Sequence, residues 1–225
     1  MGADRPFGAR NPAFAGRRLI ETYTALSKQG EHLLGNLLAG QAPIQWRHYP
    51  ENDAIDEESG YQWFYHSHSP EDRIGATEHG HLHLFARRKL WSRRMQSRHE
   101  RAFAEMLGTP DRQVNTRHLL GIGLSSKGIP TTLFTVNSWV TGDLMLSATT
   151  TKRLLSNLKL NTGYSLVDTV IEDILTLCED EIHDVLTHRD QILATRPGTH
   201  VLENRRLEAI SEIPIDLDEK IVAIR

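Results

Sequence analysis

Two runs of this sequence indicate how the chain folds: Tyr61-Gln-Trp-Phe-Tyr-His-Ser-His68 and, nine residues later, Glu78-His-Gly-His-Leu-His-Leu-Phe-Ala86. Both runs alternate with a period of two, and residues two apart share one face of a β-strand. The intervening residues 69–77 include Pro70, Asp72 and Gly75, which favour a loop between antiparallel strands. We therefore expect a hairpin that presents two rows of imidazoles on one side of a sheet.

The two runs hold five of the twelve histidines, namely His66, His68, His79, His81 and His83. Histidine is the commonest metal ligand in proteins. In a strand, the two Cα atoms of a His-x-His pair lie about 6.6 Å apart, so two rings can converge on one ion, whereas three in a row span about 13 Å. We therefore expect a metal site that takes two histidines from the second strand and one from the first.

Such a site favours a divalent metal, and zinc or iron are the candidates, because imidazole ligands suit both. An open coordination position would let zinc activate water or let iron bind oxygen. In a regular strand Glu78 points to the face opposite His79 and is not expected as a ligand. The first hypothesis is a metal-binding protein, interpreted as a zinc- or iron-dependent enzyme with a small-molecule substrate.

Two other functions fit the same residues. The run His79-Gly-His-Leu-His-Leu-Phe85 resembles the motif of histidine-triad nucleotide hydrolases and transferases. That resemblance implies metal-free attack of His81 on phosphorus, with Arg73 or a basic segment holding phosphate. A non-catalytic module that binds a small ligand is the third hypothesis. Asn137, on a later strand, is a candidate to orient a histidine or a ligand.

The composition is that of an ordinary soluble protein, with 39% hydrophobic and 24% charged residues in 225. The formal net charge of −3 argues against general nucleic-acid binding. The single cysteine, Cys178, excludes a disulfide within the chain, and no apolar stretch approaches the twenty or so residues of a membrane span. We expect a cytoplasmic protein of bacterial type.

The periodicity predicts an α+β fold with an antiparallel sheet over about 44–140, packed by an N-terminal helix and C-terminal helices. We expect a flexible arm over 1–14, then one domain over 15–225. Ranges with helical spacing are 17–38, 146–160, 165–194, 203–210 and 217–224. The segment 87–116 is rich in Lys and Arg and predicts a basic helical insertion. Strands are expected over 44–49, before an acidic connector at 51–60, and within 117–140, where His118, Leu120, Ile122 and Leu124 should share a face.

Several strings within residues 46–195 together resemble a bacterial domain family of unknown function. They are His48-Tyr-Pro, Tyr65-His-Ser-His, Arg73, Glu78-His-Gly-His-Leu-His-Leu-Phe, Leu133-Phe-Thr-Val-Asn-Ser-Trp-Val-Thr-Gly and His188-Arg-Asp. The resemblance implies a shared fold and a shared site, and it implies no particular activity.

Overall fold

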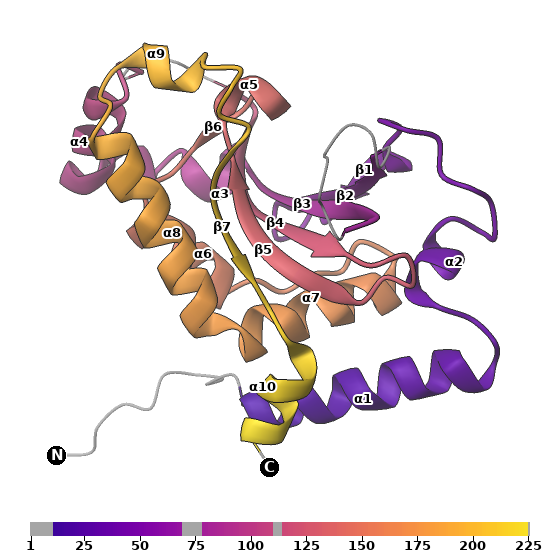
Figure 1. Ribbon diagram of the computed structural model, residues 1–225. Helices are drawn as coiled ribbons and strands as arrows, with labels where there is room; N and C mark the ends of the chain where they lie inside the picture. The colour runs from indigo at the N-terminus through magenta and orange to yellow at the C-terminus, as the bar shows by residue number, and fades with distance from the viewer. Residues whose placement is uncertain (1–10, 69–77, 110–113, 225) are drawn as a thin grey trace, which may run out of the picture.

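A computed structural model of the protein describes residues 11–68, 78–109 and 114–224. Its centre is a seven-stranded sheet with helices packed on one side (Figure 1). The strands are β1 (Tyr49–Ile55), β2 (Tyr61–Ser67), β3 (Gly80–Arg87), β4 (Thr116–Leu124), β5 (Pro130–Val136), β6 (Leu144–Met145) and β7 (Ala209–Pro214). They lie in the order β1-β2-β3-β4-β5-β7, with antiparallel neighbours throughout, and β6 pairs in parallel with β4. The predicted α+β fold is confirmed.

The helices precede, interrupt and follow the strands. They are α1 (Pro12–Lys28), α2 (Leu33–Leu37), α3 (Arg88–Trp91), the 3-10 helix η1 (Arg94–Gln96), α4 (Arg98–Met106), α5 (Ser138–Thr141), α6 (Ala148–Ser156), α7 (Ser165–Leu177), α8 (Glu179–Ala194), α9 (Thr199–Leu202) and α10 (Leu217–Ala223). The described part of the basic segment after β3 contains three short helical pieces, α3, η1 and α4. No helix in the described ranges is long and apolar enough to cross a membrane.

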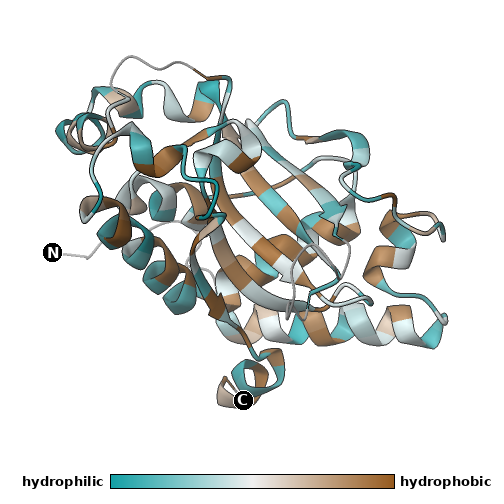
Figure 2. Ribbon diagram, turned by 45° about the horizontal axis from the view of Figure 1, so that its top comes forward, coloured by the Kyte–Doolittle hydropathy of each residue, from teal (hydrophilic) through white to brown (hydrophobic). Residues whose placement is uncertain are grey.

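Helices α1, α6, α7 and α8 cover one face of the sheet (Figure 1). Alternate residues of β2 face these helices: the indole Nε1 of Trp63 donates to Asp168 of α7 at 2.8 Å, and the hydroxyl of Tyr61 donates to the Leu154 carbonyl of α6 at 2.8 Å. Brown and pale segments alternate along the strands in Figure 2. The period of two thus separates a helix-covered apolar face from a second face.

The second face carries the imidazoles, together with aromatic rings. Phe64 of β2, Phe85 of β3 and Phe134 of β5 are all buried. Gly121 in β4 makes room for Phe134, since a Cβ at that glycine would overlap the phenylalanine ring. The ring of Phe134 then lies 4.8 Å from that of His81, centroid to centroid. An aromatic layer therefore packs against the histidines.

The N-terminal helix differs from the prediction in two ways. It begins at Pro12, capped by the Asn11 side chain, so the expected arm over 1–14 is wrong for its last residues, while 1–10 lie outside the described residues. The predicted helix over 17–38 is two helices, because Gly30 takes a φ of +71° and His32 caps α2 by accepting a hydrogen bond from the Gly35 amide at 2.9 Å. A left-handed glycine followed by an N-cap ends one helix and starts another.

Three further predicted ranges differ from the structure. The first strand starts at Tyr49, so the strand predicted over 44–49 is shifted into the acidic connector. The helix predicted over 165–194 breaks at Cys178 into α7 and α8. No helix covers 203–210; instead β7 adds an edge strand that pairs with β5. This strand depends on a distant partner, which a local periodicity does not contain.

Candidate metal centre

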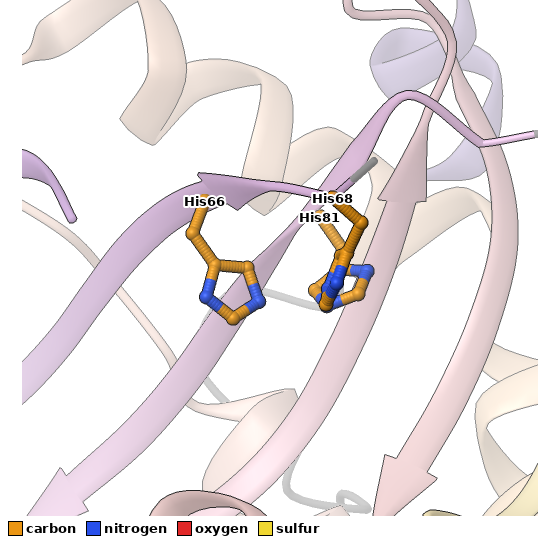
Figure 3. Close-up of side chains that lie close together, drawn as sticks. All are labelled: His66, His68 and His81. Atoms are coloured by element: carbon orange, nitrogen blue, oxygen red, sulfur yellow. The ribbon is translucent and has the colours of Figure 1, made fainter. Parts of the chain in front are cut away.

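Strands β2 and β3 bring histidines together through their register. His66 lies opposite His81, and Phe64 lies opposite His83. His68 follows the end of β2 by one residue. The side chains of His66, His68 and His81 project from these two segments to the same side of the sheet (Figure 3). The hairpin predicted from the sequence therefore forms, although the loop 69–77 lies outside the described residues.

The ring nitrogens of these histidines are close enough to share an ion. One ligand nitrogen from each of His66, His68 and His81 lies within 4.8 Å of the other two. Nε2 of His68 is 3.0 Å from Nε2 of His81, and Nε2 of His66 is 3.3 Å from Nε2 of His83. In a tetrahedral zinc site with Zn–N bonds of about 2.0–2.1 Å, neighbouring nitrogens lie about 3.3–3.4 Å apart. The His68–His81 and His66–His83 separations are close to this value, and the wider limit of 4.8 Å for His66, His68 and His81 means that these rings must move slightly inward to bind one ion.

His118 joins the cluster from β4. Its Nε2 lies 3.0 Å from Nδ1 of His83. The pairing of β3 with β4 shifts by one residue between Leu84 and Phe85, so that Phe85 lies opposite His118 while Leu84 lies opposite Leu120. This β-bulge turns His118 onto the face of the other histidines. The expectation that His118 shares a face with Leu120 is therefore wrong.

Glu78 and His79 occupy faces opposite to those expected. Nδ1 of His79 lies 2.8 Å from the hydroxyl of Tyr65, whose ring belongs to the core beneath the helices. Oε1 of Glu78 instead lies 3.4 Å from Nδ1 of His81. The regular strand begins only at Gly80, so the period of two does not extend back to these two residues. His79 is not brought to the histidine cluster, and Glu78 is.

Burial favours the neutral forms of His66, His83 and His118. His81, His83 and His118 are each at most 3% exposed, and His66 is 7% exposed. Desolvation, reinforced by the neighbouring His81 and His68, lowers the pKa of His66 to about 2. Desolvation, with the charges of Arg189 and His81, lowers the pKa of His118 to about 3. The same burial lowers the pKa of His83 well below its usual value. Neutral imidazole is the form that binds a metal.

A protein-family model covers most of the chain. The model described as "Domain of unknown function (DUF6969)" matches residues 13–215, which is most of the chain. The protein belongs to the DUF6969 family. No curated protein and no solved structure that was compared matches it. The sequence resemblance to a family of unknown function is confirmed, while similarity to the histidine-triad proteins is not shown.

The cluster of this DUF6969 protein borders the exposed side chains of Trp46 and His48. The Trp46 ring is edge-on to His68 at 4.5 Å between centroids, and this tryptophan is 56% exposed. His48 stacks on Phe64 at 3.6 Å. Its Nδ1 lies 2.8 Å from Asp53, whose other oxygen accepts a hydrogen bond from Gln62. The sequence pattern singled out neither Trp46 nor the ring of His48.

The backbone is strained at two residues next to the cluster. Trp46 has a φ of +63° and Asp53 a φ of +53°. Positive φ is unfavourable for residues other than glycine, above all for bulky ones, and such strain concentrates at functional sites. The strain therefore marks the same end of the sheet as the histidines.

The two remaining predicted site residues are not part of the described cluster. Arg73 lies outside the described residues. Asn137 is buried, and its amide nitrogen donates to the carbonyls of Val201 and Leu207 at 2.7 and 3.0 Å. Its side-chain oxygen caps α5 by accepting from the Ser138 amide. Its hydrogen bonds thus hold the C-terminal segment against the end of β5.

Proposed function

We propose that this protein binds a divalent metal ion through His66, His68 and His81, and that the ion is zinc or iron. The observation that carries the proposal is the convergence of one ligand nitrogen from each of these residues within 4.8 Å. Imidazole ligands suit both metals. The buried site also limits competition from water for the ligand positions.

The orientation of the β3 histidines supports the proposal. Both His81 and His83 direct Nε2 toward a histidine of β2 or its extension. Both have Nδ1 next to another polar group, Glu78 for His81 and His118 for His83. Histidines that bind metals use one ring nitrogen for the ion and have the other fixed by an outer partner. We infer that His66, His68 and His81 are the three protein ligands, and that His83 lies next to the ion as an outer partner of His66.

A metal with three protein ligands keeps a position open for water or substrate, which is the arrangement of catalytic rather than structural sites. We therefore propose an enzyme with a small-molecule substrate that enters beside Trp46 and His48. A bound zinc would supply an activated water, and a bound iron would supply oxygen chemistry. Attack by a metal-free His81 on phosphorus is less well supported, because its Nε2 is only 3.0 Å from Nε2 of His68.

The test is the metal content of protein purified without a histidine tag. We expect about one zinc or iron ion per chain, as in mononuclear sites, and loss of that ion in the His66→Ala/His81→Ala variant. His79→Ala is the matched control, since His79 neighbours the site in sequence but contacts Tyr65 instead. Absence of metal from the wild-type protein, even after reconstitution with zinc and with ferrous iron, would overturn the proposal.

A further inference from the structure

Glu78 is a buried carboxylate next to the candidate metal centre. Its side chain is 6% exposed, and that of His81 is 4% exposed. Oε1 lies 3.4 Å from Nδ1 of His81, while the other ring nitrogen, Nε2, faces His68 at 3.0 Å. The Glu78 carboxylate and the His68 ring therefore lie next to opposite nitrogens of the His81 ring.

Gly123 of β4 makes this position of Glu78 possible. Gly123 lies opposite His81 in the pairing of β3 with β4, so a side chain there would share the face of the histidine. A Cβ at position 123 would overlap Oε2 of Glu78. The glycine thus leaves the space that the carboxylate occupies, in a strand interior where glycine otherwise weakens the strand.

We propose that Glu78 is a positioning residue for the metal centre, acting through His81. This inference rests on the proposed metal function. The carboxylate favours the proton on Nδ1 and so leaves the lone pair of Nε2 for the ion. A cation bound at Nε2 makes Nδ1–H a stronger donor, which shortens the contact with Glu78 toward an ordinary hydrogen bond. The negative charge also attracts the cation through the ring.

The test compares zinc affinity, measured by competition with a chromophoric chelator, in Glu78→Gln and wild-type protein. The substitution keeps the size of the side chain and removes its charge. We expect zinc affinity to fall by about 10–100-fold, the usual effect of losing an outer-shell partner. Gly123→Ala should lower the affinity in the same direction, because the new methyl group displaces the carboxylate without changing it chemically.

A second readout separates positioning from general structure. The visible absorption spectrum of the cobalt(II)-substituted protein reports the ligand geometry directly, and it should change in Glu78→Gln but not in His79→Ala. If Glu78→Gln and Gly123→Ala keep wild-type zinc affinity and cobalt spectrum while His81→Ala loses both, the positioning role is wrong and the metal site stands. If the wild-type protein itself binds neither metal, the proposed function and this inference fall together.

Discussion

Nε2 of His68 lies 3.0 Å from Nε2 of His81, although the two residues are 13 positions apart and come from different segments of the hairpin. At this distance one ring nitrogen can donate a hydrogen bond to the other. The same geometry accepts a metal ion once both nitrogens present lone pairs.

Zinc should stabilise the folded protein if the cluster binds it. Binding to the native state alone adds about 2.7 kcal/mol at a free zinc concentration one hundred times Kd. For a domain of this size, each kcal/mol raises Tm by about 2–4 °C, so a rise of about 5–10 °C is expected. Differential scanning calorimetry with and without zinc measures it. An equal rise in His66→Ala/His81→Ala would contradict binding at the cluster.

The metal-free protein should lose stability in mild acid. Burial lowers the pKa of His66 to about 2 and that of His118 to about 3, whereas unfolded histidine titrates near about 6.5. Between these values the unfolded chain binds more protons than the folded chain, so the free energy of unfolding rises with pH. This contribution is complete above the unfolded pKa and is lost as pH falls below it.

Urea unfolding in the presence of a chelator, at pH 7.5 and at pH 5, measures this loss. A His66→Phe variant should show a weaker dependence, because one buried titrating group is gone. Equal stability of the wild-type protein at both pH values would show that the buried rings accept protons without cost, contrary to the expectation.

The ion pair between Arg18 and Asp173 should stabilise the packing of α1 on α7. Both oxygens of Asp173 accept from the Arg18 Nε, at 3.1 and 2.8 Å, and Nη2 donates to Oδ1 at 2.6 Å. Hydrogen bonds to charged groups contribute about 1.5–3 kcal/mol, and solvent screening of the partly exposed arginine reduces this. We expect Asp173→Asn to lower the free energy of unfolding by about 1–2 kcal/mol.

Urea unfolding measures this effect as well. Glu57→Gln is the control, since the Arg87–Glu57 pair is exposed on the surface and should contribute less than about 1 kcal/mol. If both substitutions lower the free energy of unfolding by the same amount, burial of Asp173 does not strengthen its ion pair.

Cys178 should be inert in the native protein. It is fully buried where α7 meets α8. Burial, with the nearby Glu181, raises the pKa of its thiol to about 12, so almost no reactive thiolate exists at pH 8. We expect iodoacetamide to label the protein only after denaturation. Rapid labelling of the folded protein at pH 8 would contradict this placement of the thiol.

The sheet face of most site residues follows from the sequence alone, because the side chains of a strand alternate with a fixed period of two. The alternation through Phe64 and His66 of β2, and through His81 and His83 of β3, placed these rings on one surface. The loop between the two runs predicted their antiparallel pairing, and their register follows from the apolar residues that must face the helices.

The exceptions to that period depend on how the strands pair and end in the folded protein. A bulge in the pairing of β3 with β4 brings His118 to His83, and the irregular residues before β3 exchange the expected places of Glu78 and His79. Bulges and strand ends depend on contacts with distant segments, such as the Tyr65 ring and the space above Gly123. The local periodicity of a sequence does not contain those contacts, so it could not identify the outer partners of the histidines.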